Sequence, residues 1–235
     1  MDAPQKKPVV VAVIPAYNEE SKISKVVEKV SGYVDHVIVI DDGSNDETFS
    51  KAKSAGAVVK RLEENQGYGF AIREGIDYAI DLFDCPFVVL IDGDGQHPAY
   101  RIPELVSKLR EDYDIVFTAR GFSGQMPALK RVGNFFLTSA INIVTGMHLH
   151  DSQSGFRAFN SKSFKKMDLT KNRYEFGSEI ILETKNKSLK YCEMPIETIY
   201  HKKEGGTTLM DGIKIFFHVL SLKINKSLHK PKLRS

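Results

Sequence analysis

A regular alternation of apolar runs and amphipathic segments in the first half of the chain constrains its fold more than any other feature. The runs are rich in Val and Ile and predict buried strands, while the segments between them carry apolar residues at helical spacing. Strands are expected at 9–16, 35–42, 56–62 and 86–92, and helices at 18–33, from about 46, and at 67–83. Continuously apolar strands joined by helical crossovers favour a parallel sheet that helices cover on both faces.

The second half of the chain is less regular. It predicts a strand at 113–120, a helical region at 126–146, a loop at 151–160 that leads into a strand, a helix at 176–188 and a strand at 189–201. No internal repeat, linker composition or low-complexity block divides the chain, and 235 residues suit one domain. We therefore expect a single α/β domain with a Rossmann-like, mostly parallel sheet flanked by helices.

Composition narrows the class of partner. The net charge of +3 is too weak to argue for nucleic acid, and the chain has no Trp. No apolar run approaches the ~18 to 20 residues that a spanning helix needs, and the N-terminus lacks the apolar core of a signal peptide. The two cysteines form no CxxC pair, which is typical of buried thiols in a reducing compartment. We expect a cytosolic protein that binds no nucleic acid.

The strand at 86–92 ends in the sequence LIDGDGQHP, at the edge where sheets of this kind bind ligands. Asp92, Asp94 and Gln96 alternate there with glycines that permit a tight turn. Their oxygen atoms could converge on a hard divalent cation such as Mg²⁺ or Mn²⁺. Without a cation, two carboxylates so close together would repel each other. A plain polar turn is the alternative, and we favour the metal site.

Two other metal sites are disfavoured. Counted from Asp92, a calcium loop of the helix-loop-helix type requires glycine sixth and glutamate twelfth, where this chain has His97 and Pro103. His148 and His150 have the spacing of a ligand pair, but no third histidine or cysteine has suitable spacing. An ordinary turn is favoured over a second metal site there.

The loops after the first two strands suggest a nucleotide. PAYNEE, 15–20, has no glycine and carries two glutamates, which would repel phosphates, so it suits a nucleobase edge or a ribose hydroxyl. In DDGSND, 41–46, Ser44 together with Glu47 predicts a capping box at a helix start. Asp42 is not explained by the capping box and is a candidate acceptor for nucleobase or ribose.

Taken together, these loops predict a nucleotide whose diphosphate meets a metal at the third loop. A metal-bridged diphosphate is useful chiefly as a leaving group, because the cation neutralises the charge that grows on the departing oxygen. We therefore expect group transfer from an activated nucleotide, with a sugar as the group that is transferred.

Six motifs, PAYNEE, VIDDGSNDET, NQGYGFAIREG, LIDGDGQHP, TAR and DSQSGFRAF, follow one another along about residues 8–208. In this order they resemble the motifs of inverting family-two glycosyltransferases of the GT-A fold. The chain is most similar to the polyprenyl-phosphate sugar transferases of that family, the dolichol-phosphate mannosyltransferase-like branch. The resemblance implies a GT-A catalytic domain over residues 1–210.

The resemblance also implies roles for individual residues. Catalysis would depend on Asp94, Arg120 and Arg131, with the two arginines facing the donor and acceptor phosphates. The late basic segment of the family is only loosely matched: Lys202 stands in for its first basic residue, but Thr208 occupies a place where lysine is common. The implied metal ligands are Asp92, Asp94 and Gln96, and the implied nucleotide-binding residues are Pro15, Ala16, Tyr17, Glu19, Ile40, Asp42 and Gly93.

The acceptor decides whether the reaction needs a base. Transfer to a hydroxyl needs a general base, for which Asp151 and Glu179 are the best candidates. A lipid phosphate needs none, because a second pKa near ~6 makes it an anionic nucleophile at neutral pH, and arginine suits its charge. In that case we expect Asp151 to shape the site and Arg157 to pair with a carboxylate. The candidates for contact with acceptor or sugar are thus Asp151, Arg157, Glu179 and Lys202.

A lipid acceptor requires access to a bilayer. Residues 211–235 combine apolar residues at helical spacing with a basic tail, which resembles an interfacial amphipathic helix. The alternative is that this apolar stripe packs on the domain itself, and 134–144 is a second candidate for a lipid-facing surface. We expect peripheral binding at the cytosolic membrane face, directly or through a small membrane-anchor subunit.

The sequence as a whole predicts a metal-dependent inverting transferase. It would move a hexose or an N-acetylhexosamine from a GDP- or UDP-linked sugar to polyprenyl (dolichyl) phosphate, with Mg²⁺ or Mn²⁺ as cofactor. One alternative is a family-two enzyme whose acceptor is a hydroxyl of a sugar, glycerate or protein. Another is a non-catalytic scaffold that binds a nucleotide sugar.

Overall fold

The computed structural model describes residues 8–121 and 128–197 of the chain. Three predictions lie outside these residues: the domain boundary at residue 210, the C-terminal amphipathic helix within 211–235, and the candidate acceptor contact Lys202. They stay predictions.

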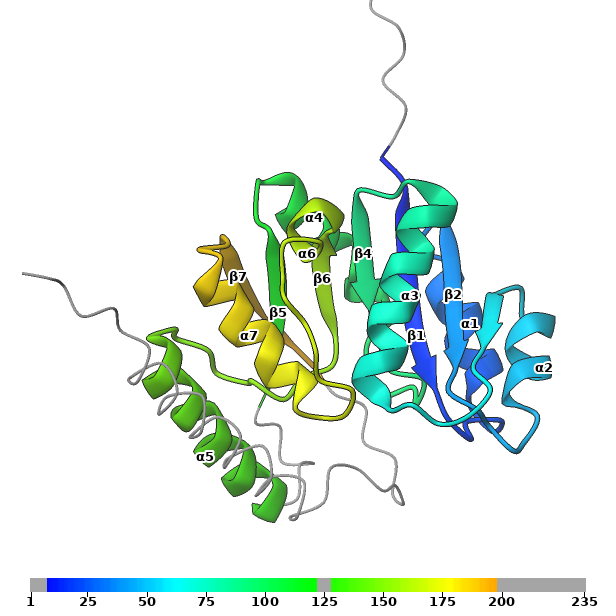
Figure 1. Cartoon of the computed structure of the whole chain (residues 1–235), viewed down its shortest axis with the longest axis horizontal. Helices are drawn as coiled ribbons and strands as arrows, with labels where there is room; N and C mark the ends of the chain where they lie inside the picture. The colour runs from blue at the N-terminus through cyan, green and yellow to red at the C-terminus, as the bar shows by residue number, and fades with distance from the viewer. Residues whose placement is uncertain (1–7, 122–127, 198–235) are drawn as a thin grey trace, which may run out of the picture.

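A seven-stranded sheet forms the centre of the described part, in the order β3-β2-β1-β4-β6-β5-β7 (Figure 1). Neighbouring strands are parallel except for β6, which runs antiparallel to β4 and β5. The strands are β1 (Val10–Ala16), β2 (His36–Asp41), β3 (Val58–Arg61), β4 (Phe87–Leu90), β5 (Ile115–Arg120), β6 (Arg157–Asn160) and β7 (Tyr191–Ile196). The prediction of an α/β domain with a mostly parallel sheet is confirmed.

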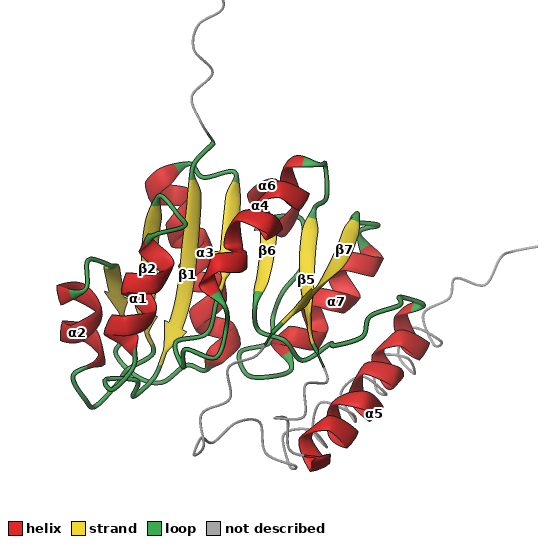
Figure 2. Ribbon diagram, turned by 180° about the vertical axis from the view of Figure 1, so that it is seen from behind, coloured by secondary structure: helices red, strands yellow, loops and turns green. Residues whose placement is uncertain are grey.

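Helices cover both faces of this sheet (Figure 2). One face carries α1 (Ile23–Ser31), α2 (Thr48–Ser54) and α4 (Ile102–Arg110), and the other carries α3 (Tyr68–Phe83), α6 (Ser161–Phe164) and α7 (Phe176–Asn186). Successive residues of β1 enter the two buried clusters in turn, with Val11 and Val13 in one and Ala12 and Ile14 in the other. Because both clusters are apolar, β1 is apolar throughout and shows no alternation.

A glycine in α3 sets how closely this helix lies on the sheet. A Cβ added to Gly75 would lie 2.5 Å from Val13 Cγ1 and 2.9 Å from Ile40 Cγ1, so the helix backbone rests directly on β1 and β2. The helix begins at Tyr68, at the edge where the parallel strands end. Tyr68 is thereby placed beside the turn that follows β4.

The structure differs from the predicted elements at several places. The first helix begins at Ile23 instead of 18, because Asn18 has a left-handed backbone with φ of 55° and does not continue a helix. The helix α4 was not predicted, although its apolar residues at 102, 105, 106 and 109 have helical spacing. The short 3-10 helix Ala99–Arg101 leads into it.

The predicted capping box is wrong. The helix α2 begins at Thr48, whose backbone N–H donates to the carboxylate of Asp46 at 2.9 Å. The Ser44 hydroxyl instead accepts a hydrogen bond from the N–H of Asn18 at 2.9 Å. Ser44 therefore joins the first two loops and does not cap the helix.

The helix α5 (Ala128–Thr145) lies beyond the ends of β5 and β7 and packs against α7 (Figures 1 and 2). Its outer side is apolar: the exposed fractions of Phe135, Phe136 and Ile143 are 62%, 64% and 72%. Its inner side buries the polar Asn134 and Thr138 as well as Ile141. An ordinary surface helix has the reverse arrangement. None of the helices in the described ranges has the length and apolar character to cross a membrane.

Candidate active site

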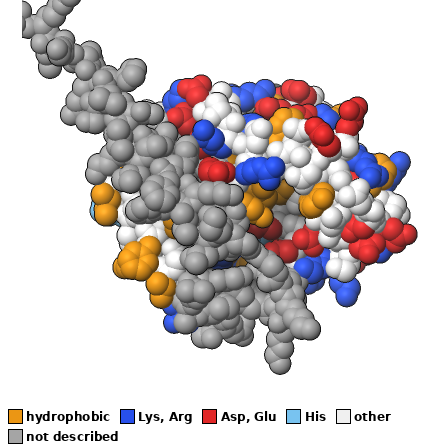
Figure 3. Space-filling view, turned by 60° about the horizontal axis from the view of Figure 1, so that its bottom comes forward, with side chains coloured by type: hydrophobic (Ala, Val, Ile, Leu, Met, Phe, Trp, Pro, Cys, Tyr) orange, Lys and Arg blue, Asp and Glu red, His pale blue; other side chains and the backbone are white. Residues whose placement is uncertain are grey.

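The carboxyl ends of the parallel strands bring the predicted nucleotide-binding residues to one edge of the sheet. The strand register pairs Pro15 with Ile40 there. Gly93 faces the same place, because a Cβ added to it would lie 3.3 Å from the carbonyl oxygen of Pro15. Ala16 ends β1, and the exposed Tyr17 follows it. Figure 3 looks onto this end of the molecule, where acidic and basic side chains surround a hollow.

Hydrogen bonds tie the first two loops to each other. The N–H of Asn18 donates to Ser44 Oγ at 2.9 Å, and the N–H of Glu19 donates to Thr48 Oγ1 at 2.8 Å. The side-chain oxygen of Asn18 in turn accepts from the N–H of Asn45 at 2.9 Å. The loop that carries Glu19 is therefore held in place by hydrogen bonds to the loop after β2.

Asp42 has partners that the sequence did not predict. It is 4% exposed, and its two oxygens accept the N–H groups of Gln66 at 2.7 Å and Gly67 at 2.9 Å. Burial raises the pKa of Asp42, although these two hydrogen bonds act in the opposite direction. Asp42 thus orders the loop before α3, and a nucleotide would have to use its remaining lone pairs.

The carboxylate of Asp92 is oriented by two side chains. Its Oδ1 accepts from the hydroxyl of Tyr68 at 2.8 Å, and its Oδ2 accepts from Nε2 of His97 at 2.8 Å. The His97 ring is stacked on Phe156, with 5.4 Å between the ring centroids. Burial alone would raise the pKa of Asp92, but the contact with His97, the bond from Tyr68 and the charge of Arg120 together lower it. Asp92 is therefore ionised and fixed in direction.

The oxygen atoms in this turn fit a divalent cation. Each oxygen of Asp92 accepts one bond, which leaves it a further lone pair. Asp94 is close to Gln96, whose N–H donates to its Oδ1 at 2.9 Å. Within the described residues, no three or more His, Cys, Asp or Glu side chains form a group that could hold a metal ion. Mg²⁺ is commonly held by one or two carboxylates together with substrate phosphates, and the donors in this turn are compatible with that arrangement.

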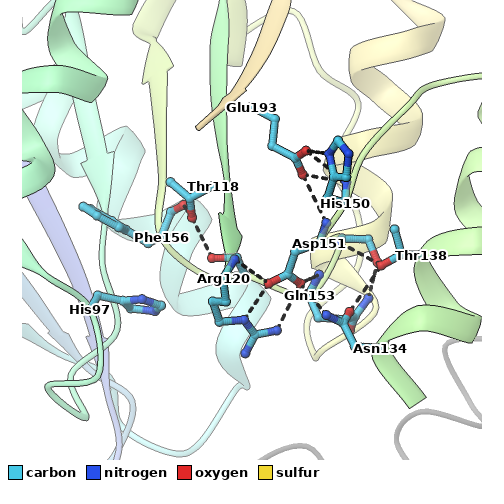
Figure 4. Close-up of polar contacts among 12 residues, drawn as sticks. His97, Thr118, Arg120, Asn134, Thr138, His150, Asp151, Gln153, Phe156 and Glu193 are labelled. Carbon is cyan, nitrogen blue, oxygen red and sulfur yellow. Dashed lines mark hydrogen bonds and ion pairs between the residues drawn. The ribbon is translucent and has the colours of Figure 1, made fainter. Parts of the chain in front are cut away.

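Arg120, the last residue of β5, is held in place by Asp151 (Figure 4). Asp151 Oδ2 accepts from Nε of Arg120 at 2.6 Å and from its backbone N–H at 3.1 Å, while Oδ1 accepts from Nη2 at 3.0 Å. Oδ1 also accepts from Nδ2 of Asn134 and from the N–H of Gln153, both at 3.0 Å. The charge of Arg120 lowers the pKa of Asp92, so the fixed guanidinium is within electrostatic range of one predicted metal ligand.

Both candidate bases have carboxylates that are already engaged by several hydrogen-bond donors. Asp151 accepts five hydrogen bonds, and a carboxylate offers about four lone-pair sites. Burial would raise its pKa, but the charge and hydrogen bonds of Arg120 lower it on balance. Glu179 accepts from the N–H and hydroxyl of Thr170 and from the N–H of Lys171. Both carboxylates thus hold the loops around the site.

The prediction that Arg157 pairs with a carboxylate is wrong within the described part of the chain. The guanidinium donates instead to the carbonyl oxygens of Ser154, Gly177 and Ser152 at 2.9, 2.9 and 3.0 Å. It lies over the ring of Phe117, 5.3 Å from the centroid, and burial lowers its pKa. Arg157 therefore braces two backbone segments from inside the protein, the loop before β6 and the first turn of α7.

Sequence reasoning missed the side chains that orient the predicted ones. Arg131, which was predicted, lies on α5 three residues before Asn134 and so shares its face of the helix. Asn134 itself carried no signal beyond being a polar residue within an apolar helical pattern. His97 stood in the quoted LIDGDGQHP motif, but a single sequence does not say which atom it contacts. The missed side chains are Tyr68, His97, Asn134, Thr138 and Glu193, the last of which accepts the N–H groups of His150 and Asp151.

Known proteins are similar to this chain in sequence over most of its length. It is 38% identical over 229 residues to an uncharacterized protein of Methanocaldococcus jannaschii, with 93% of each chain covered. It is 32% identical over 243 residues to a UDP-N-acetylglucosamine–dolichyl-phosphate N-acetylglucosaminyltransferase of Methanococcus voltae, covering 92% of this chain and 96% of that protein.

A solved structure shares the fold. Glucosyl-3-phosphoglycerate synthase from Mycobacterium tuberculosis, in complex with UDP, superposes with a TM-score of 0.75 at 21% identity, over 96% of this chain and 82% of that one. That enzyme has also been crystallised with Mn²⁺, UDP and its product. The family model described as Glycosyl transferase family 2 matches residues 11–168. With the strand-end site described above, these matches show that the chain belongs to glycosyl transferase family 2.

Proposed function

We propose that this enzyme transfers a hexose or an N-acetylhexosamine, with inversion, from a nucleoside-diphosphate sugar to polyprenyl phosphate. The relative from Methanococcus voltae, which matches nearly end to end, is named for transfer to dolichyl phosphate. The observation that carries the proposal is the clamp between Arg120 and Asp151. It fixes a guanidinium within electrostatic range of Asp92 and occupies the carboxylate of Asp151, one of the two candidate bases.

An acceptor that is already anionic suits this arrangement. A phosphate monoester has a second pKa near ~6 and is a nucleophile at neutral pH without losing a proton to the enzyme. One of its oxygens would bond to the anomeric carbon while the bond from that carbon to the diphosphate oxygen breaks. The nucleoside diphosphate leaves with the electron pair, and no proton changes place. Arg120 and Arg131 would hold the acceptor phosphate.

The donor would lie along the edge of the sheet. The loops after β1 and β2 would hold the nucleoside through Pro15, Ala16, Tyr17, Glu19, Ile40 and Asp42, with Gly93 close by. Asp92, Asp94 and Gln96 would hold Mg²⁺ or Mn²⁺ together with the diphosphate. When bound, the cation neutralises negative charge on the departing diphosphate. Tyr68 and His97 keep Asp92 ionised and aimed for that task.

The acceptor implies a membrane surface, and α5 supports peripheral binding there. The exposed Phe135, Phe136 and Ile143 form an apolar stripe on the helix that also carries Arg131. In Figure 3, hydrophobic side chains protrude along one margin of the strand-end face. Apolar side chains beside a basic residue suit an anionic membrane surface. We propose binding at the cytosolic membrane face, directly or through a small membrane-anchor subunit.

A transfer assay with matched acceptors tests the function. The full-length enzyme is incubated with Mn²⁺ and labelled UDP-N-acetylglucosamine, UDP-glucose or GDP-mannose, and with a polyprenyl phosphate in detergent. We expect label to enter the organic phase with one of these donors, and no label when free polyprenol replaces the phosphate. Transfer to polyprenol, or to a water-soluble hydroxyl acceptor in preference to the phosphate, would reject the proposal in favour of a hydroxyl-directed enzyme. Binding of a nucleotide sugar without any turnover would favour the scaffold alternative.

A further inference from the structure

The inner face of α5 is joined to the candidate active site by buried polar side chains. Asn134 is 8% exposed and Thr138 is 4% exposed, and both face the loop that precedes β6. A buried amide or hydroxyl destabilises a protein unless it is hydrogen-bonded. Apolar side chains would pack a helix against the domain without this cost. The buried polar pair Asn134 and Thr138, which we call the polar seam, therefore calls for another explanation.

The hydrogen bonds of this seam fix the direction of the Asn134 amide. Its carbonyl oxygen is 3.2 Å from the hydroxyl of Thr138, which donates, and its Nδ2 donates to Asp151 Oδ1 at 3.0 Å. Thr138 is held in turn by the N–H of Ser152, which donates to its hydroxyl at 3.0 Å. Figure 4 shows Thr138, Asn134, Asp151 and Arg120 in one continuous row.

We propose that Asn134 is a positioning residue for Arg120, on which it acts through Asp151. Asp151 Oδ1 lies between the two, with Nδ2 of Asn134 and Nη2 of Arg120 each at 3.0 Å. Asn134, together with the N–H of Gln153, therefore sets the rotation of the carboxylate, and the carboxylate sets the plane of the guanidinium. The inference rests on the proposed function, in which that guanidinium holds the acceptor phosphate. It also gives α5 two tasks, because its outer side carries the apolar stripe that would meet the lipid.

A double-mutant cycle separates positioning from mere support of the helix. In Asn134→Leu the branching at Cγ and the number of side-chain heavy atoms are kept while the donor to Asp151 is lost. Because a hydrogen bond to a charged group is removed, kcat/KM for polyprenyl phosphate should fall about ten- to a hundredfold. In an Arg120→Lys background the guanidinium is already absent. There the change Asn134→Leu should lower kcat/KM by less than about threefold.

Asn142 provides the matched control on the same helix. It also anchors α5, since its Nδ2 donates to the carbonyl of Leu149 at 2.8 Å and its Oδ1 accepts the N–H of Leu149 at 3.0 Å, but it has no bond to Asp151. Asn142→Leu should therefore have the same effect in both backgrounds. Equal losses for Asn134→Leu in both backgrounds would show that Asn134 only supports the helix, and would overturn the inference.

A second readout does not depend on turnover. In an NMR spectrum of the full chain, the Nε–H of Arg120 should exchange slowly with water, because it donates to Asp151 at 2.6 Å. We expect this slow exchange in the wild type and in Asn142→Leu, and fast exchange in Asn134→Leu; unchanged exchange in Asn134→Leu would also overturn the inference. A wild type that transfers no sugar to polyprenyl phosphate would reject the proposed function, while the NMR result would still decide the positioning.

Discussion

Gly155 lies so close to Asp92 that a Cβ in its place would require the Asp92 carboxylate to move. A Cβ added to Gly155 would lie 2.4 Å from Oδ2 and 2.7 Å from Oδ1 of the Asp92 carboxylate. These distances are shorter than any ordinary contact, so the loop before β6 closes directly over the side chain that we propose as a metal ligand. The glycine of the DSQSGFRAF motif is thus explained by a close approach and needs no unusual backbone angle.

Gly155→Ala should therefore displace Asp92. We expect at least a tenfold loss of transfer activity and about 1 to 3 kcal/mol of lost stability, in the range for overpacking a tight site. Gly133→Ala is the control, since a Cβ there meets nothing within 4 Å, and it should leave activity unchanged while stabilising the helix slightly. Transfer assays and thermal unfolding of both variants provide the measurement. Wild-type turnover in Gly155→Ala would mean that the Asp92 carboxylate need not be held where the structure places it.

The proposed cation site predicts a specific defect for Asp94→Asn. Removing one carboxylate charge should weaken Mn²⁺ binding and lower the rate by roughly a hundredfold or more, because a bound cation contributes several kcal/mol of stabilisation to the departing charge. Calorimetric titration of UDP at rising Mn²⁺ concentration measures the loss directly. Ser50→Ala, on the exposed side of α2, is a suitable control. UDP binding with an unchanged dependence on Mn²⁺ in Asp94→Asn would remove the basis for the site.

The sequence predicted those features that depend on a pattern of several residues. It did not predict those that depend on a single contact between distant residues. The parallel strands were predictable because a strand buried on both faces must be apolar throughout, as in β1. The strand-end position of Asp92, Asp94 and Arg120 followed from topology alone. By contrast, Ser44 fits a capping box by spacing, yet it contacts Asn18, which is 26 residues away.

The partners of charged groups were the hardest features to predict. Arg157 was expected to pair with a carboxylate, but backbone carbonyls at residues 152, 154 and 177 accept its hydrogen bonds. Two of those carbonyls come from the loop before β6, whose path no local pattern specifies, and the third comes from the first turn of α7. The same reason hid Asn134 and His97, whose importance depends on which carboxylate the fold brings to them. Motifs locate a site, and long-range contacts decide how it is held.

The pH dependence of stability should report the Asp151 clamp. The pKa of Asp151 is lower in the folded protein than its ordinary value of 3.8, so the carboxylate contributes stability above that value and the contribution is lost as pH falls through the folded pKa. The difference in unfolding free energy between the wild type and Asp151→Asn should thus be largest near neutral pH and shrink below about pH 4. Denaturant unfolding at several pH values checks this.

Asp42 provides an internal comparison of opposite sign. Burial raises its folded pKa, so its ionised form is disfavoured by folding and the wild type gains stability relative to Asp42→Asn as pH falls from neutrality through that pKa. As the solution is acidified, the difference in unfolding free energy between wild type and variant should shrink for Asp151→Asn and shift in favour of the wild type for Asp42→Asn. Parallel pH profiles for both would contradict the assignment of Asp151 as a tightly paired carboxylate.

The apolar stripe of α5 predicts binding to lipid vesicles. Burying the exposed parts of Phe135 and Phe136 in an interface should contribute about 2 to 3 kcal/mol in total, which corresponds to a roughly thirty- to hundredfold change in partitioning. We expect the double variant Phe135→Ser with Phe136→Ser to lose vesicle binding to that extent. It should keep its affinity for UDP with Mn²⁺, because both rings are largely exposed to solvent. Leu82→Ser, which alters another exposed apolar residue on α3, should bind vesicles as the wild type does.

Sedimentation with vesicles that contain an anionic lipid measures the binding of the wild type and of both variants. Equal losses for both kinds of variant would indicate a general effect of surface hydrophobicity, and no loss in the phenylalanine variant would place the lipid-binding surface elsewhere on the chain.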